Sequence, residues 1–315
     1  MDISGVVVIR NGVRLGYPFI ESLLSLLPLC DEVVVCEAYS DDGTYEWLER
    51  LRDKHPAKIR LVREHWPEGL SGGKSIGVMQ TRAMRYCRGR WIYLLQADEI
   101  MPGENVQYLQ ELIAPRRVLR RVSSTPGNHP KSENLPPVPE TAAEPPREIV
   151  SEKKHRRDLA VARGLGIVTD RIYNSYAVDF VHVSQNFQRV KFRNPYRWAV
   201  RLVRNRPWIY SCDDGWQLQG PGSWPVGTAR MPHPIWHLGY VFPVNRWRKI
   251  INHARLYPDH PFFEEAMPEA ERCLRDYENG QTFDFPRETS LVLPPLIAPL
   301  VGEPEYRVRE EILDD

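Results

Sequence analysis

Residues 91–99 read Trp-Ile-Tyr-Leu-Leu-Gln-Ala-Asp-Glu, a run of apolar residues that ends abruptly in two carboxylates. A short apolar run of this kind is typical of a buried β-strand. A carboxylate at the carboxyl end of such a strand lies at the rim of a cleft, where Mg²⁺ or Mn²⁺ commonly joins it to substrate phosphates. An alternative stays open, in which Asp98 and Glu99 cap a helix that starts near Pro102.

The sequence before this stretch alternates between apolar runs and helical patterns. Between predicted helices, we expect four strands at residues 6–9, 33–35, 59–62 and 91–95. This order predicts an α/β fold whose Rossmann-type parallel sheet has helices on both faces. Ligands of such sheets bind beyond the carboxyl ends of the strands, which singles out Asn11, Glu37 and Asp98.

A second acidic loop follows the predicted strand at residues 33–35. It begins at Glu37 and continues through Ser-Asp-Asp-Gly-Thr at residues 40–44, which includes Asp42. A carboxylate just past such a strand can accept hydrogen bonds from a ribose or a base. A plain Asp-Gly turn explains the same residues, so both interpretations remain open.

The composition excludes several classes of protein. Of the 315 residues 26% are charged, yet the net charge is only +1, which gives no basic bias for binding nucleic acid. The five cysteines form no CxxC pair, so we expect free thiols rather than a zinc site or a disulfide framework. We also expect no signal peptide and no transmembrane segment, and hence a cytoplasmic protein, because the most apolar stretch, residues 19–29, is too short to span a bilayer.

The chain divides by composition into four parts. Residues 1–114 form the predicted α/β half, and residues 115–160 contain a stretch rich in Pro, Ser and Glu with few large apolar residues. Such a stretch buries too little surface to offset its ordering entropy, so we predict a flexible insertion, either without function or as a lid over an acceptor site. Mixed α/β sequence follows at 161–257, with a basic helix near its end, and residues 258–315 form a Pro- and Glu-rich extension.

The order and spacing of these motifs resemble the family 2 glycosyltransferases. The resemblance rests on Asn11 after the first strand, Val-Val-Val-Cys-Glu at 33–37, Ser-Asp-Asp-Gly-Thr at 40–44, Gln-Thr-Arg at 80–82, and Gly-Arg-Trp at 89–91 leading into Gln-Ala-Asp-Glu at 96–99. It covers residues 4–113 well and the remainder loosely. The resemblance implies a GT-A-like fold, a nucleotide-diphosphate sugar as donor, and a glycan, lipid-linked or small-molecule acceptor.

The resemblance also assigns roles to residues of the first half. It implies that Glu37 contacts the nucleotide and that Asp98 binds Mn²⁺ or Mg²⁺ in a DXD motif. Gln96 replaces the first carboxylate of that motif, as in a branch of the family with a QADE form, which puts the need for a cation in doubt. The candidate residues for donor binding are Asn11, Glu37, Asp42, Lys74, Gln96 and Asp98.

The second half supplies candidates for catalysis. An inverting transfer needs a general base, for which we choose Asp214 with Asp213 as runner-up, although Asp-Asp-Gly is also an ordinary hairpin turn. The resemblance implies that His237 completes the metal site or contacts the diphosphate; a purely structural histidine is the alternative. Basic residues of the helix after it, at positions 246, 248 and 249, could neutralise the leaving group or simply face solvent.

Three other functions deserve comparison. Gly72-Gly73-Lys74-Ser75 resembles the end of a Walker loop, but position 68 is Glu where that motif needs Gly, so we exclude a triphosphatase. Lys74 nevertheless remains a candidate to approach the diphosphate. A sugar-phosphate nucleotidyltransferase would normally carry a Gly-rich loop after the first strand, and residues 10–13 are a poor version of one. A non-catalytic nucleotide-sugar-binding protein gains support from Gln96.

Overall fold

The structure is a computed structural model, and it describes residues 2–70, 73–113, 149–150, 174–184, 186–191, 198–215, 217–220 and 228–313. The predicted insertion at residues 115–160 lies outside these ranges except for residues 149–150. The strands of the described part are β1 Ile3–Ile9, β2 Glu32–Glu37, β3 Ile59–Arg63, β4 Trp91–Leu94, β5 Glu99–Ile100, β6 Ile149–Val150, β7 Ser175–Ser184, β8 Arg189–Lys191, β9 Trp198–Arg204, β10 Tyr210–Cys212, β11 Gln217–Gln219, β12 Thr228–Arg230 and β13 Ile235–Tyr240.

The main sheet has the strand order β3-β2-β1-β4-β9-β7-β12-β6. The four strands predicted in the first half pair in parallel, β2 with β3 and β1 with both β2 and β4. Strand β9 runs antiparallel to its two neighbours, β4 and β7. The second half therefore extends the same sheet with strands of mixed direction.

Side chains of each central strand point alternately to two hydrophobic cores, one on each face of the sheet. Val7, Val33 and Val35 lie in the core that contains side chains of α2 and α3. Val6 and Val34 lie in the other core, which contains side chains of α4. Because strands buried on both faces must be apolar throughout, the unbroken β-branched runs of the sequence follow from this layering. The predicted α/β class, with helices on both faces of the sheet, is confirmed.

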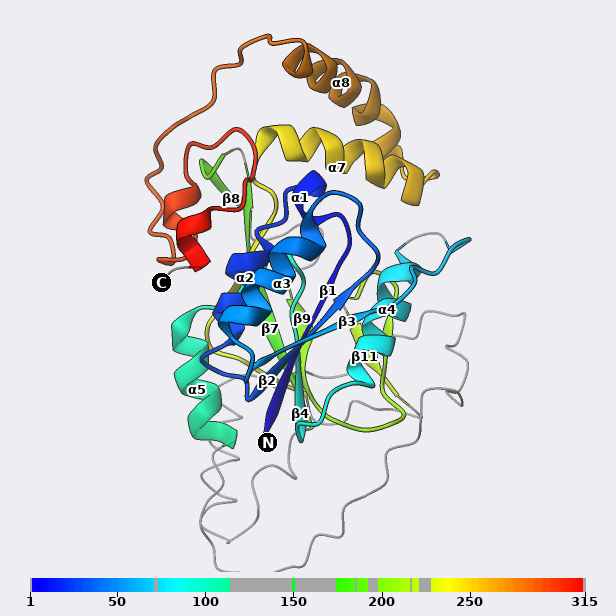
Figure 1. The fold of residues 1–315 in the computed structure, drawn as a ribbon, viewed down its shortest axis with the longest axis vertical. Coiled ribbons are helices and arrows are strands. Elements are labelled where there is room, and N and C mark those ends of the chain that lie inside the picture. The colour runs from blue at the N-terminus through cyan, green and yellow to red at the C-terminus, as the bar shows by residue number, and fades with distance from the viewer. Residues whose placement is uncertain are drawn as a thin grey trace, which may run out of the picture.

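The helices of the described part are α1 Gly12–Leu15, α2 Phe19–Leu26, α3 Thr44–Lys54, α4 Lys74–Met84, α5 Gly103–Ile113, α7 Pro243–Leu256 and α8 Pro261–Glu278, with the short helices η3 Ala298–Leu300 and η4 Glu310–Leu313. In Figure 1 the amino end of β1 lies near the N-terminus, and α7 and α8 cross the opposite end of the molecule, above α1. The hairpin of α7 and α8 therefore covers the edge of the sheet where the parallel strands of the first half end.

The carboxyl-terminal extension contains more regular structure than the Pro-rich composition predicts. Helix α8 begins with proline in its first turn, a position that tolerates proline because no hydrogen-bond donor is needed there. After α8 the chain returns across the molecule, and the ring of Tyr306 is buried against Phe19 and Phe242. The Tyr306 hydroxyl donates a 2.8 Å hydrogen bond to Oε2 of the buried Glu21 on α2. The extension thus packs on α2 and on the residue that precedes α7.

All five cysteines are buried and free, as their spacing predicts. Among the residues that the structure describes, no helix combines the length and the apolar character needed to cross a membrane.

Candidate functional site

A cavity of about 430 Å³ opens at the carboxyl edge of the sheet, beneath α7 and the start of α8. Five residues singled out in the sequence line it, namely Asn11, Gln96, Asp98, Asp214 and His237. They come from the ends of β1 and β4, from the β10–β11 turn and from β13. Residues far apart in the sequence thus meet at the place where α/β sheets bind their ligands.

Strand β13 brings His237 to Asp98. It pairs with β5 through His237 and Glu99, and with β7 through His237 and His182. The main-chain N–H of Leu238 also donates a 2.8 Å hydrogen bond to the main-chain oxygen of Asp98. The carboxylates of this segment bind Lys249 and Arg201, so they do not cap α5, which was the alternative left open by the sequence.

The carboxylate of Asp98 is almost fully buried and binds a lysine. Nζ of Lys249, on α7, lies 2.7 Å from Oδ2 of Asp98, and Nε2 of His237 lies 3.6 Å from the same oxygen. Burial raises the pKa of Asp98, but nearby positive charge outweighs it and holds this pKa well below its usual range. Burial also lowers the pKa of His237 to about 3, so this imidazole is neutral at neutral pH. Lys249 therefore supplies the charge that keeps Asp98 ionised.

A buried ion pair joins Glu99, next to Asp98, to β9, the neighbour of β4 in the sheet. Arg201 of β9 and Glu99 are both fully buried, and the guanidinium binds both carboxylate oxygens, at 3.0 and 2.6 Å. Burial raises the pKa of Glu99, and the charge of Arg201 opposes that shift. Oε2 of Glu99 also accepts a 3.0 Å hydrogen bond from the main-chain N–H of Gln96. Glu99 thus holds the turn that presents Gln96 and Asp98.

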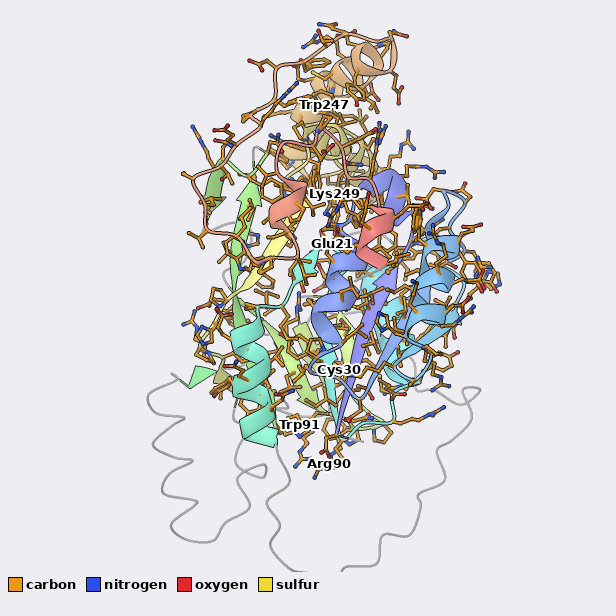
Figure 2. The ribbon with its side chains drawn as sticks, turned by 60° about the vertical axis from the view of Figure 1, so that its left-hand side comes forward. Glu21, Cys30, Arg90, Trp91, Trp247 and Lys249 are labelled. Atoms are coloured by element: carbon orange, nitrogen blue, oxygen red, sulfur yellow. The ribbon has the colours of Figure 1, made fainter. Side chains whose placement is uncertain are left out.

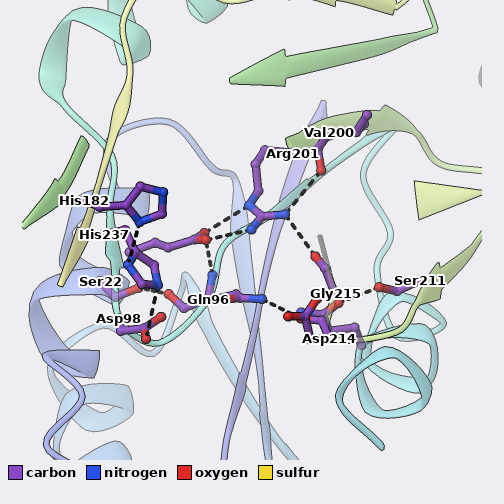
Figure 3. A network of polar contacts seen from close by, with 12 residues as sticks. Ser22, Gln96, Asp98, His182, Val200, Arg201, Ser211, Asp214, Gly215 and His237 are labelled. Carbon is purple, nitrogen blue, oxygen red and sulfur yellow. Dashed lines mark hydrogen bonds and ion pairs between the residues drawn. The ribbon is translucent and has the colours of Figure 1, made fainter. Parts of the chain in front are cut away.

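Hydrogen bonds from Arg201 and Gln96 reach the loop that carries the candidate base Asp214 (Figure 3). Nη1 of Arg201 donates a 3.0 Å hydrogen bond to the main-chain oxygen of Gly215, and Nε2 of Gln96 donates one of 2.8 Å to that of Asp214. Two side chains therefore fix the Asp214–Gly215 backbone relative to Asp98. The hydrogen bond from Arg201 is buried and the one from Gln96 is partly buried.

The structure places both aspartates of this loop in the turn between β10 and β11. The hairpin interpretation of the sequence is thus correct, yet Asp214 also lines the cavity. Asp213 has a left-handed backbone, with φ of 46°, and its main-chain oxygen accepts a hydrogen bond from Gly77 of α4. Asp213 does not line the cavity, so of the two candidates Asp214 is the one positioned to act on a ligand there.

Glu37 differs from the expectation that it touches the nucleotide directly. Its side chain is fully buried; one oxygen accepts a hydrogen bond from the Ser40 main-chain N–H, and the other lies 2.7 Å from Nε of Arg63. The Ser40 hydroxyl in turn accepts a 2.8 Å hydrogen bond from the main-chain N–H of Asn11, which lines the cavity. Glu37 therefore shapes the site through Ser40, because both of its oxygens are already bonded within the protein.

Two further candidates lie outside the cavity. Asp42 accepts hydrogen bonds from the main-chain N–H of Arg14 and from Thr44, so it joins the acidic loop to α1. Lys74 is an exposed residue at the start of α4 and is not among the residues that line the cavity. Their proposed roles in donor binding stay predictions.

Several residues of the site were not singled out by sequence. Arg201 sits in the middle of a strand that is buried on both faces, and a buried arginine requires a carboxylate partner; that is the signal that could have found it. His182 on β7 lies 3.2 Å from His237, measured between the two Nδ1 atoms. Lys249 appeared in the sequence only as one of several basic residues on a helix, and no local pattern distinguishes it.

The donor atoms around Asp98 do not fit a divalent cation. Mg²⁺ and Mn²⁺ take several oxygen ligands, whereas here Asp98 already binds an ammonium and the amide of Gln96 is bonded to Asp214. Within the described ranges, no group of three His, Cys, Asp or Glu side chains is arranged to hold a metal ion. The expected pair of metal ligands, Asp98 and His237, does come together, but Lys249 binds the same Oδ2 atom of Asp98 that His237 approaches.

The chain matches one family model and several solved structures. Residues 6–129, less than half of the chain, match the model of the family described as Glycosyl transferase family 2. No curated protein matches the chain. Solved structures match the chain only at low sequence identity.

TarS residues 1–349 of S. aureus are 12% identical, with 89% of this chain and 71% of that chain covered and a TM-score of 0.38; a longer TarS structure is covered over 44% of its length. Mannosyltransferase PcManGT of Pyrobaculum calidifontis, in complex with GDP-Man and Mn²⁺, is 15% identical, with 89% and 76% covered and a TM-score of 0.32. Glucosyl-3-phosphoglycerate synthase of Mycobacterium tuberculosis, in complex with Mn²⁺, UDP and phosphoglyceric acid, is 24% identical, with 36% and 40% covered and a TM-score of 0.25.

These likenesses are too weak to assign a substrate or a cofactor, because one fold serves many functions. The match to the family model is more informative, since it spans the strands and loops that contribute Asn11, Gln96 and Asp98 to the cavity. Residues 6–129 of this chain are thus similar in sequence to the family 2 glycosyl transferases.

Proposed function

We propose that this protein is a glycosyltransferase that moves a sugar from a nucleotide-diphosphate sugar to an acceptor hydroxyl with inversion at the anomeric carbon. One observation carries the proposal: the carboxylate–ammonium pair of Asp98 and Lys249 and the carboxylate of Asp214 line the same cavity. The cavity lies at the edge of the half that matches the family model. A cationic group for a leaving diphosphate and a base for an incoming hydroxyl are the two parts that such a transfer needs.

The proposed reaction is a single displacement. The acceptor oxygen attacks the anomeric carbon from the side opposite the diphosphate, and its proton passes to the carboxylate of Asp214. The bond between the anomeric carbon and the diphosphate oxygen breaks, and its electron pair stays with the diphosphate. The donor is bound with the diphosphate toward Lys249 and the nucleotide toward Asn11, Arg10 and Trp66, which line the same cavity.

The acceptor is assigned to the end of the cavity formed by the α7–α8 hairpin. Tyr257, His260 and Phe263 line that end, and the ring centroids of Tyr257 and His260 lie 5.9 and 4.9 Å from that of Phe263. Flat aromatic surfaces with polar edges suit the faces of sugar rings. This lining supports a sugar-containing acceptor, and the acceptor classes suggested by the sequence stay open beyond that.

The direct test begins with a panel of nucleotide sugars screened by thermal shift, because a ligand that binds only the folded state raises the melting temperature. The donor so identified is then assayed for transfer and for slow hydrolysis, in which water replaces the acceptor. Asp214→Asn should retain donor binding and lose about 100-fold or more of the rate, as expected for removal of a general base. Asp213→Asn is the matched control and should retain the rate.

Two results would contradict the proposal. If no nucleotide sugar binds, the cavity has another ligand. If a donor binds but is neither transferred nor hydrolysed, the second candidate, a non-catalytic nucleotide-sugar-binding protein, is favoured. Two observations support that candidate: residue 96 is an uncharged glutamine bonded to Asp214, and Asp98 is already bonded to Lys249.

A further inference from the structure

We propose that Lys249 takes the place of the divalent cation, so that this protein binds the diphosphate of its donor without a metal ion. The inference rests on the proposed function and specifies how the same site works. It starts from the disagreement between the metal expected at Asp98 and the residues found there.

The position of Lys249 is that of a built-in cation. Its side chain is 6% exposed and projects from α7 into the cavity, with Nζ 2.7 Å from Oδ2 of Asp98. The ring centroids of Tyr17 and Tyr240 lie 4.8 and 4.7 Å from Nζ, close enough for cation–π attraction. Figure 2 shows Lys249 toward the α7 end of the molecule, opposite Arg90 and Trp91 at the amino end of β4. An ammonium has three N–H donors, and Asp98 uses one of them.

The charges at the site also argue against a second cation. The charges of Asp98 and Lys249 cancel, because the two side chains form an ion pair, and Gln96 is uncharged. A divalent ion near Asp98 would therefore meet the ammonium of Lys249 at short range in a partly buried site, where like charges repel strongly. A diphosphate, in contrast, would meet the positive end of the ion pair.

Glycine at position 239 makes room for this pair. A Cβ atom at Gly239 would lie 2.4 Å from Oδ2 of Asp98 and 2.5 Å from Nζ of Lys249. Both distances are far below van der Waals contact, so a larger residue here would displace the charged ends of both side chains. The Trp-His-Leu-Gly-Tyr segment at 236–240 thus contributes two things to the site, the His237 side chain and the space at Gly239 that Asp98 and Lys249 occupy.

In the proposed transfer, the ammonium of Lys249 donates a hydrogen bond to the diphosphate while the bond to the anomeric carbon breaks. The electron pair of that bond stays on the diphosphate, the acceptor proton goes to Asp214, and Lys249 keeps its own protons. Asp98 positions Lys249 and prevents it from swinging into solvent. A fixed cation of this kind stabilises charge that develops in the transition state without reorganisation.

Calorimetric titration with UDP, GDP, CDP, ADP and dTDP tests the inference on the wild-type protein. The titrations are made in excess EDTA and again with MnCl₂ or MgCl₂ at about 5 mM, a concentration chosen to saturate a metal site. We expect one diphosphate to bind with the same Kd, within about twofold, in all three buffers. Binding that appears only with a metal overturns the inference but leaves the proposed function intact. Failure of every diphosphate to bind in any buffer overturns both.

Variants then test the role of Lys249. Because Lys249→Met leaves a buried carboxylate unpaired and could unfold the protein, the informative variant is the double substitution Asp98→Asn/Lys249→Met, which is neutral and similar in volume. We expect its Kd for the diphosphate to rise about 10- to 100-fold, the range for loss of a charged hydrogen bond. Arg248→Met is the matched control, because it removes a cation from the same helix that binds Glu305 outside the cavity.

A converse variant, Gln96→Asp/Lys249→Met, exchanges the ammonium for a second carboxylate. We expect Mn²⁺ alone to raise the melting temperature of this variant and to leave that of the wild type unchanged. Stabilisation of the wild type by Mn²⁺, or wild-type affinity of the Asp98→Asn/Lys249→Met protein in EDTA, would each refute the role assigned to Lys249.

Discussion

The side-chain amide of Gln96 donates a 2.8 Å hydrogen bond to the main-chain oxygen of Asp214, 118 residues further along the chain. Gln96 links the loop after β4 to the loop between β10 and β11. The residue thus has a structural use of its own: it fixes the backbone of the proposed base relative to the Asp98–Lys249 pair.

Replacing Gln96 with alanine should therefore slow transfer more than it weakens donor binding. We expect kcat to fall about tenfold, since misplacing a catalytic group slightly is costly. The Kd of the donor should change about twofold or less. Steady-state kinetics and calorimetry measure the two quantities. Gln110→Ala is the control, because Gln110 donates a similar bond to the Pro28 main chain on the exposed face of α5. Equal losses in binding and rate would mean that Gln96 contacts the donor.

The buried pair of Arg201 and Glu99 should be a major contributor to stability. Arg201→Met leaves a fully buried carboxylate without its guanidinium, so we expect about 3–5 kcal/mol of destabilisation in chemical denaturation. The double variant Arg201→Met/Glu99→Gln should recover part of this loss. Arg272→Met, which breaks an exposed pair with Glu269, should leave stability almost unchanged, because solvent screens such pairs. Similar losses for the two arginines would contradict this account.

Acid should destabilise the protein through two buried histidines. Burial lowers the pKa values of His237 and His253 to about 3 each. Below the unfolded pKa of about 6.5 the unfolded chain takes up protons that the folded protein does not, so stability falls as the pH drops from about 6.5 toward 3. The contribution is on the order of 1 kcal/mol per histidine per pH unit.

Variants isolate this effect from other titrating groups. His253→Gln keeps a polar group near the Tyr240 hydroxyl, which lies 2.8 Å from Nδ1 of His253. We expect denaturation experiments at pH 7.5 and 5 to show a smaller loss of stability for this variant than for the wild type. The exposed His233, changed to Gln, is the control and should behave as the wild type. An unchanged loss in His253→Gln would show that this histidine is not buried in its neutral form.

Glu21 should have the opposite dependence on pH. Burial raises its pKa to about 7, so between about pH 4.3 and 7 the folded protein holds a proton that the unfolded chain has lost. Its contribution to stability is therefore present below the unfolded pKa and is lost as the pH rises through 7. Glu21→Gln keeps a partner for the Tyr306 hydroxyl and should be more stable than the wild type at pH 8, with a smaller gain at pH 5.

Thermal or chemical denaturation at the two pH values measures this difference. Glu46→Gln changes an exposed glutamate of α3 and should alter stability by less than about 0.5 kcal/mol at either pH. If Glu21→Gln were destabilising at pH 8, the ionised carboxylate would be stabilised by Arg309, whose Nη2 lies 3.8 Å from Oε1 of Glu21, and its pKa would not be raised in the folded protein.

The first half of the fold could be predicted because its signals are local. The β-branched runs at 6–9 and 33–35 are apolar on both sides of the strand, and only a sheet covered on both faces buries them. The helical spacing of apolar residues between them gives the connections. Asp98 was identifiable for the same reason, since an apolar strand that ends in a carboxylate marks the ligand-binding edge.

The extension after residue 258 could not be predicted with the same certainty. Its prolines and glutamates suggest an irregular surface segment, yet 18 residues of it form α8 and Tyr306 is buried against Phe19. The reason is that tertiary packing overrides weak local preference when a segment covers apolar surface elsewhere in the molecule.

By itself, the sequence determined that the chain has an α/β half with carboxylates at the ends of its strands, because periodicity and strand termination are properties of neighbouring residues. The tertiary structure alone decided which groups those carboxylates meet. Lys249 reaches Asp98 across 151 positions and Arg201 reaches Glu99 across 102. Such pairs depend on how α7, β9 and β13 pack. The residues next to Asp98 and Glu99 in the sequence therefore do not reveal that these carboxylates bind Lys249 and Arg201.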